Sequence, residues 1–187
     1  MYTVQTVAPV GEVVTLDECK LFAIIDIDDD NAVVQGLIDA CIAHVENITN
    51  RQLITASFEL YNDKFIQDLI MPKGKLQSLT SIEYMDDDGV YQTLSTDDYY
   101  DFGEFDRFKI HFDKIPNHKR NKKAIKISFD SGYGLLSTDV PNPIKLWIKM
   151  KVKDLYEHRD MFEDFTKFEM PDSHIDVMLK MYRIQPL

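Results

Sequence analysis

Residues 33–60 read VVQGLIDACIAHVENITNRQLITASFEL, and a change of hydrophobic period inside this stretch decides the fold class. Up to Ile48 the apolar residues follow one another at intervals of three or four, which predicts one buried stripe along a helix. After Arg51 the interval falls to two, with Phe58 and Leu60 separated by one polar residue, which predicts a strand. The chain is therefore expected to pass from helix to sheet near Arg51.

The sequence before this stretch predicts a shorter helix over residues 15–26. Thr15 and Glu18 have the spacing of a capping box, in which the threonine side chain accepts the backbone N–H three residues on. An acidic turn separates this helix from the one over residues 31–50. The two helices should form an antiparallel hairpin whose apolar faces another element must cover.

An antiparallel sheet is predicted to be inserted over about residues 55–130. Its clearest feature is Asp88-Gly89, which lies between two alternating segments, because Asp-Gly supplies the positive φ angles of a tight hairpin turn. Further short strands are expected over residues 99–102, 108–112 and 124–129.

A third helix is predicted over residues 142–158, and it is the candidate to cover the hairpin. Asn142-Pro143 is a helix start, because the missing N–H of a proline costs nothing in the first turn. The fold class is therefore α+β, a small helical bundle of three main helices with an inserted antiparallel β-sheet. We expect one domain over residues 1–160, followed by an extended C-terminal arm over residues 161–187 that contains a short amphipathic helix.

Composition excludes several classes of protein. The 187 residues carry a formal net charge of -11, so the molecule as a whole should be repelled by nucleic-acid backbones and anionic membranes. We expect no membrane segment and no secretory leader. Cys19 and Cys41 are interpreted as buried free thiols of a chain made in a reducing cytoplasm, with a disulfide between them left open.

No pattern in the sequence predicts catalysis, a metal or a cofactor. Asp26, Asp28 and Asp30 have the alternate spacing of a calcium loop, but Asn31 and Leu37 stand where that loop needs glycine and a bidentate acid. Helix capping and solubility explain these aspartates better. The five histidines are scattered, and phosphate loops and nucleophile motifs are missing. A small metal-dependent hydrolase or nuclease that uses the aspartate-rich turns is kept as an alternative.

One segment is strongly basic, which contrasts with the acidic whole. It could contact phosphate or an acidic protein surface, or be a solvated loop between two strands, which is the more common role of a charge run. Its charged residues are Lys119, Arg120, Lys122, Lys123 and Lys126.

The order of several phrases resembles the head-tail connector (head-completion adaptor) family of tailed bacteriophages. The first phrase is Val14-Thr15-Leu16-Asp17-Glu18-Cys19-Lys20, and the second helix ends in Val45-Glu46-Asn47-Ile48-Thr49-Asn50-Arg51-Gln52-Leu53-Ile54. Others are Met71-Pro72-Lys73-Gly74-Lys75-Leu76-Gln77-Ser78, Ser128-Phe129-Asp130-Ser131-Gly132-Tyr133-Gly134 and Tyr156-Glu157-His158-Arg159. Asn50 stands where the family prefers glycine, a mild departure because asparagine also tolerates a left-handed helix end. The resemblance covers about residues 14–160.

This resemblance implies a subunit of a ring, commonly twelvefold, in the neck of a virion, and the missing catalytic motifs imply that the subunit is not an enzyme. Such a ring docks beneath the portal protein, closes the head and gives a stopper or tail-completion protein its platform, while DNA passes through the lumen without sequence-specific contacts. A stopper or tail-completion protein further down the neck is the nearest alternative, and a monomeric binding module is a more distant one. The family picture places the C-terminal segment against the portal, so the candidate contacts are Ile175, Met178, Leu179, Tyr182 and Arg183. Packing on their own domain is the competing role for these residues.

Overall fold

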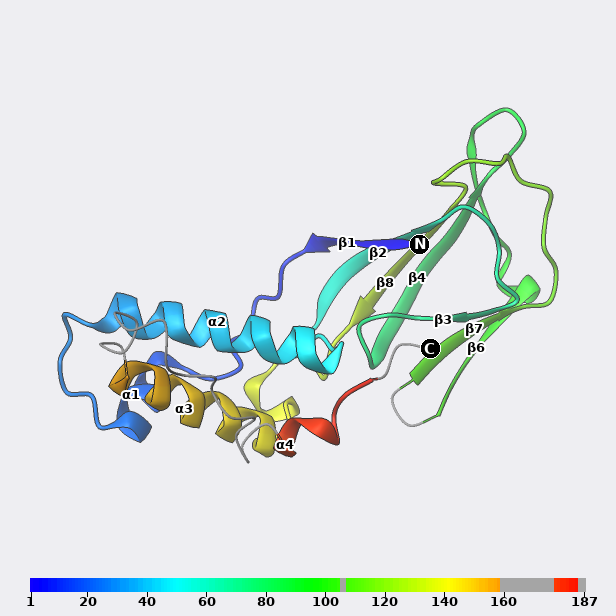
Figure 1. The fold of residues 1–187 in the computed structure, drawn as a ribbon. Helices are drawn as coiled ribbons and strands as arrows, with labels where there is room; N and C mark the ends of the chain where they lie inside the picture. Colours follow the sequence, from blue (N-terminus) through cyan, green and yellow to red (C-terminus); the bar gives the residue numbers. More distant parts are fainter. Residues whose placement is uncertain (105–106, 159–176, 185–187) are drawn as a thin grey trace, which may run out of the picture. The chain divides into compact units, whose positions relative to one another are not determined.

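The computed structural model describes residues 1–104, 107–158 and 177–184, which form two compact units (Figure 1). The sheet unit comprises Met1–Val10 and Ile54–Leu135. The helical unit comprises Gly11–Leu53 and the described residues from Leu136 onward. The chain therefore crosses between the two units three times.

The helical unit consists of four α-helices and a single 3-10 turn, η2, among the described residues. The helices are α1 (Leu16–Ala23), α2 (Asn31–Thr49), α3 (Asn142–Glu157) and α4 (Val177–Lys180), and η2 spans Ser137–Asp139. The Thr15 hydroxyl accepts the Glu18 N–H at 3.1 Å, as the capping box predicts. Helix α1 ends at Ala23 rather than at residue 26, because Ile24 turns into the left-handed conformation.

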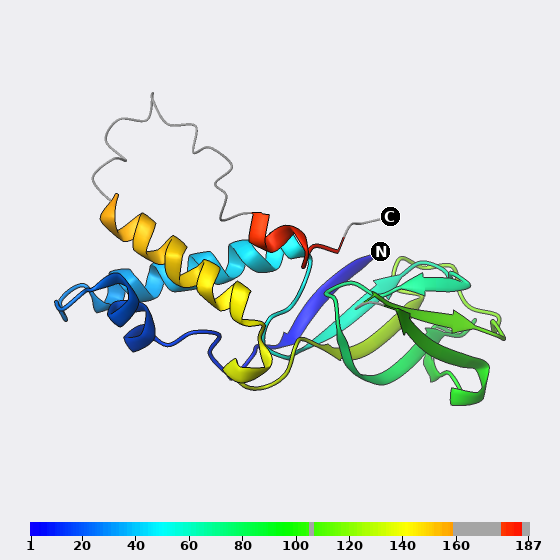
Figure 2. The same ribbon diagram turned by 90° about the horizontal axis from the view of Figure 1, so that it is seen from below.

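Helix α3 covers the α1–α2 hairpin, as predicted. It contacts both helices, and Figure 2 shows α2 and α3 side by side with α4 at one end of α2. The largest fully buried side chain of this core is that of Trp147. The other buried apolar residues of α1, α2 and α3 are Cys19, Ala23, Val34, Ile38, Cys41, Val45, Ile144, Ile148 and Val152.

The sheet unit contains two antiparallel sheets. The five-stranded sheet has the order β1-β2-β8-β4-β5, and the three-stranded sheet has the order β3-β7-β6. The strands are β1 (Tyr2–Val7), β2 (Ala56–Asn62), β3 (Asp68–Ile70), β4 (Leu76–Met85), β5 (Tyr91–Thr93), β6 (Tyr99–Glu104), β7 (Arg107–Phe112) and β8 (Ile125–Ser131), with a 3-10 turn η1 at Thr96–Asp98. The long β4 and the short β5 form the hairpin predicted around Asp88-Gly89.

One apolar core joins the two sheets. Strands β2 and β8 pair antiparallel in register, and in each of them every second residue is buried. Their inward side chains, such as Leu60 and Phe129, share a core with Ile110 and Phe112 of the other sheet. The outward face of the five-stranded sheet is polar. For example, Asp130 accepts hydrogen bonds from Ser57 and Ser78, both at 2.6 Å.

The predicted α+β class, with helices and an inserted antiparallel sheet, is confirmed. The sequence did not predict β1, which pairs with β2 and places the first residues of the chain at the edge of the sheet. Of the predicted arm, only residues 177–184 are described, and they pack on α2 and α3. Among the described residues, no helix is both long enough and apolar enough to span a membrane.

Candidate interaction surfaces

The acidic turn between α1 and α2 is held by hydrogen bonds and an ion pair. Lys20 lies 2.7 Å from the Asp28 carboxylate and also donates to the Asn31 side chain at 2.7 Å. This contact with Lys20 lowers the pKa of Asp28. Asp30 accepts a hydrogen bond of 2.5 Å from the Tyr156 hydroxyl of α3. Within the described ranges, no group of three or more histidine, cysteine or acidic side chains could hold a metal ion.

The start of α1 is tied to α3 by Glu18. Its carboxylate lies 3.0 Å from the ammonium group of Lys149. The pKa of Glu18 is lowered, first by the hydrogen bond with Lys149 and to a smaller extent by the backbone of Thr15. The side chain of Glu18 thus serves both the predicted cap and the packing of α3 on the hairpin.

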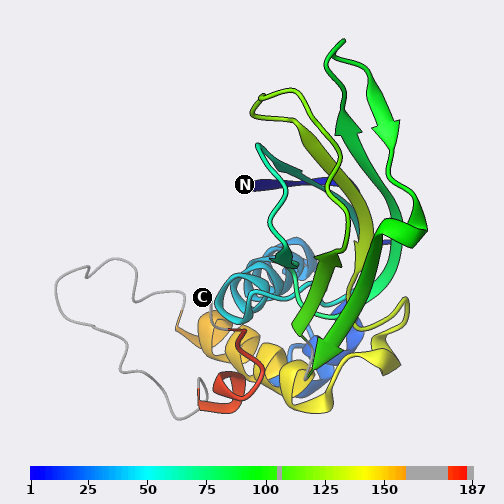
Figure 3. The ribbon, with the colours of Figure 1, turned by 90° about the vertical axis from the view of Figure 1, so that its right-hand side faces the viewer.

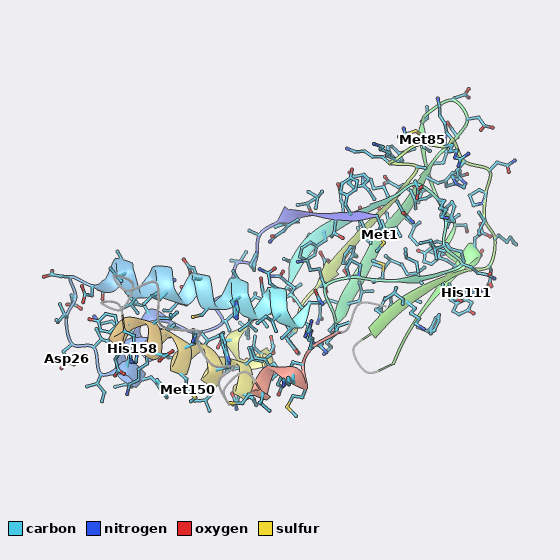
Figure 4. The ribbon with its side chains drawn as sticks, in the orientation of Figure 1. Met1, Asp26, Met85, His111, Met150 and His158 are labelled. Atoms are coloured by element: carbon cyan, nitrogen blue, oxygen red, sulfur yellow. The ribbon has the colours of Figure 1, made fainter. Side chains whose placement is uncertain are left out.

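The basic loop lies beside the acidic turn of the β4–β5 hairpin, at one end of the sheet unit (Figure 3). The Lys119 N–H donates to the Met85 carbonyl at 2.9 Å, and the Met85 N–H donates to the Ala124 carbonyl at 2.8 Å. Met85 marks this tip in Figure 4. Because residues 86–88 are all aspartates, acids and bases gather at the same tip. The loop therefore does not form an isolated cationic surface.

The predicted basic residues divide into two groups. Lys126 lies on the polar face of the sheet, 3.1 Å from Glu83 and 3.5 Å from Glu59, and its pKa is raised chiefly by the hydrogen bond with Glu83. The remaining four are exposed. One of them, Lys123, has its ammonium group 5.0 Å from the centre of the Tyr61 ring. The exposed group is Lys119, Arg120, Lys122 and Lys123.

The end of α2 anchors the C-terminal segment 177–184. The Ile184 N–H donates to the Thr49 carbonyl at 2.9 Å, and the Asn50 side chain donates to the Ile184 carbonyl at 2.9 Å. The Arg51 guanidinium, only 5% exposed, donates to the Tyr182 carbonyl at 2.5 Å. Sequence reasoning missed this role, because three adjacent residues that look like a helix end bind a segment more than a hundred residues away.

The candidate portal contacts have different environments. Leu179 is buried, Met178 and Tyr182 are half-buried, and Arg183 is exposed. Ile175 lies outside the described residues. Leu179 therefore packs on its own domain in this conformation, while Met178, Tyr182 and Arg183 keep accessible surface.

The helical unit also buries its two cysteines. Cys19 and Cys41 are free thiols, and burial raises the pKa of each to about 11. A thiol with such a pKa is almost entirely protonated at neutral pH and is a poor nucleophile. Their surroundings are those of core packing residues.

A family model matches the first part of the chain. Residues 13–89 match that of the phage gp6-like head-tail connector protein. The resemblance to phage head-tail connectors is confirmed by this match. The matched segment begins just before α1 and includes α2, the Thr49-Asn50-Arg51 anchor and the turn between β4 and β5. No curated protein sequence matches the chain.

Solved structures of gene transfer agent particles share the fold. A chain in the neck of an empty particle, computed with C6 symmetry, has 18% sequence identity and a TM-score of 0.80. A chain in a native virion has 17% identity and a TM-score of 0.79, and one in a native neck with C12 symmetry has 17% and 0.77. Each likeness covers 100% of this chain and 97% of the other. The likeness to these chains therefore extends beyond the segment that the family model matches.

Proposed function

We propose that this chain is a structural head-tail connector subunit, one copy of an oligomeric ring in the neck of a tailed phage or phage-like particle. The family match over residues 13–89 carries the proposal, because it names the connector role directly. The likeness over the whole chain to neck proteins of C6 and C12 particles supports it. The virion neck is accordingly where the protein acts.

A structural role also agrees with the chemistry of the described side chains. The acidic turn is occupied by Lys20 and Tyr156, and the cysteines are protonated and buried. The matched family is that of head-tail connector proteins, and the similar solved chains come from the necks of particles. The role proposed for this chain therefore involves contact surfaces and no catalytic step.

The proposed ring lets DNA pass through its lumen without sequence-specific binding. The net charge of -11 supports this, since an acidic wall repels the phosphates that move past it. The basic residues add little attraction. Lys126 is paired with two glutamates, and the exposed lysines lie beside the Asp86–Asp88 turn.

The partners of the ring are proposed to be the portal protein on the head side and a stopper or tail-completion protein on the tail side. Portal contact is proposed for Ile175, Met178 and Tyr182, and the accessible surface of the last two supports it. Arg183 is also exposed, but its charge suits the contact between copies that is proposed below. Leu179 supports that contact indirectly, because its burial positions the segment.

The function is tested by mixing the purified chain with rings of the portal protein from the same particle. The mass of the resulting complex, measured by native mass spectrometry, should correspond to one portal ring carrying several copies of the chain. Val10→Ser, which changes an exposed apolar residue of the sheet unit, is the matched control and should bind equally well. A portal ring that binds no copies would contradict the proposed function.

A further inference from the structure

Exposed apolar side chains gather at the α1–α2 end of the helical unit. Leu21 is 83% exposed, Ile24 is 78% exposed and Ile27 is 55% exposed. Asp26 and Asp29 are exposed beside them, and among the described residues neither has an ion-pair partner. Figure 4 places Asp26 at this end of the unit. We call the five residues the acidic corner.

The backbone of Ile24 is strained, although its side chain is exposed to solvent. Its φ of 60° and ψ of 50° place a β-branched residue in the left-handed region, which such residues rarely adopt. Helix α2 ends in the same conformation, but there the residue is Asn50, which tolerates it. A strained apolar residue that points to solvent indicates a surface that is covered in the working assembly.

A surface of the opposite charge lies at the other end of α2. Segment 177–184 contains Lys180 and Arg183 and no acidic residue, and both bases are exposed. Val177 and Met181 are exposed beside them, at 55% and 76%. We call these four residues the basic face. Its backbone is fixed by the hydrogen bonds to Thr49, Asn50 and Arg51, so the surface is already formed before any partner binds.

The two surfaces of one chain cannot meet each other. The acidic corner precedes the first turn of α2, and segment 177–184 is bonded to its last turn. A helix of 19 residues is about 28 Å long. Figures 1 and 2 both show α4 at the end of α2 away from the α1–α2 connection. Any contact between the two surfaces must therefore join different copies.

We propose that the acidic corner of one copy binds the basic face of the next copy. Apolar residues on both sides supply the buried area, and Asp26 and Asp29 meet Lys180 and Arg183 at the rim. Because the two surfaces differ, the contact is head-to-tail, and repeating it generates a ring when the rotation closes. The proposal deepens the proposed function, on which it rests, by assigning the subunit contact.

Charge reversal tests the contact in the absence of the portal. The first variant combines Asp26→Lys with Asp29→Lys, and the second combines Lys180→Glu with Arg183→Glu. In each variant the two surfaces carry like charge, so each alone should associate more weakly than the wild type, by about tenfold or more. An equal mixture restores opposite charges at every contact and should recover assembly with alternating copies. Sedimentation velocity measures all three samples.

The salt dependence gives a second readout of the same contact. Association of the wild-type chain should weaken between roughly 0.05 M and 0.5 M NaCl, because exposed ion pairs are screened. The inference is overturned if the wild type stays monomeric at low salt, if the variants associate as well as the wild type, or if the mixture does not recover.

Ile24→Gly separates assembly from folding. Glycine removes the backbone strain, so the thermal midpoint of the isolated chain should stay the same or rise, while association weakens. Lys73→Gly is the matched control, because Lys73 has a φ of 72° in the sheet unit and lies outside both surfaces. It should relieve strain without changing association. Equal association of Ile24→Gly and wild type would contradict the role of the acidic corner.

The portal experiment distinguishes a failure of this inference from a failure of the proposed function. If the wild type binds portal rings but the charge-reversed mixture does not recover, the chain is a connector whose copies meet elsewhere. If the second variant alone loses portal binding and the mixture does not recover, the basic face belongs to the portal contact. Both results overturn the inference and leave the proposed function standing.

Discussion

Replacement of Arg51 by methionine should release the C-terminal segment from the end of α2. The guanidinium donates to the Tyr182 carbonyl, and the side chain is 5% exposed. Methionine keeps most of the apolar stem but removes the charge and the donor. A hydrogen bond from a charged group contributes about 1.5–3 kcal/mol. We therefore expect the docked state of segment 177–184 to lose about 2 kcal/mol, which is about thirtyfold in its ratio to the undocked state.

Hydrogen exchange at a single amide measures this loss. The Ile184 N–H donates to the Thr49 carbonyl at 2.9 Å, so its exchange reports the docking of the segment. In Arg51→Met it should exchange about thirtyfold faster, while the amides of β8, in the sheet unit, keep their protection. Lys114→Met is the control, because Lys114 is 78% exposed and its ion pair with Asp98 is 3.4 Å long. Unchanged exchange at Ile184 in Arg51→Met would refute the anchoring role of Arg51, since the remaining hydrogen bonds would then be sufficient.

Three further predictions concern the two cores and the start of α1. Gly132→Ala should destabilise the sheet unit by more than about 2 kcal/mol in urea unfolding, because φ is 153° and a Cβ there would lie 2.5 Å from the Thr55 backbone. Cys19 and Cys41 should not react with a thiol reagent at pH 8 until the protein is unfolded, since burial raises the pKa of both to about 11. Reaction at the rate of a free thiol would contradict their burial. The lowered pKa of Glu18 stabilises the fold above its ordinary value of 4.5, and this contribution disappears as the pH falls through the lowered pKa. Thermal midpoints of wild type and Glu18→Gln should therefore differ at pH 7 and converge in acid.

The parts of the fold that the sequence predicted correctly are those with local signals. Helix α2 has a long stripe of period near 3.6, and the start of α1 has a side-chain cap, so both depend on residues close together in the chain. The β4–β5 turn is equally local, because Asp88-Gly89 supplies its geometry.

The features that the sequence could not predict depend on distant partners. Strand β1 has mostly exposed side chains and therefore lacks the alternation of a half-buried strand, although its backbone pairs with β2. The end of α1 was placed too late because the left-handed turn occurs at an isoleucine, where glycine or asparagine would have signalled it. The contact of Arg51 with the Tyr182 carbonyl gave no signal, because any residue carries such a backbone group.

The candidate surfaces were only partly predictable for a similar reason. The charge of the basic loop was evident, but the pairing of Lys126 with Glu59 and Glu83 requires the order of β2, β8 and β4. The failed calcium spacing around Asp28 was sufficient to favour a structural role, and the structure supplies Lys20 as the partner.

The three crossings between the units impose an order on folding during synthesis. The α1–α2 hairpin is made first, but Trp147, Ile144 and Ile148 of α3, which cover it, follow only after the whole of Ile54–Leu135. At about 5–20 residues per second, those intervening residues take roughly 4–16 s to translate. During that interval the hairpin carries its apolar stripe uncovered, and the sheet unit receives its last strand, β8, only near the end of it. A nascent chain that emerges from the ribosome is thus expected to be a client of hydrophobic-binding chaperones until α3 is complete.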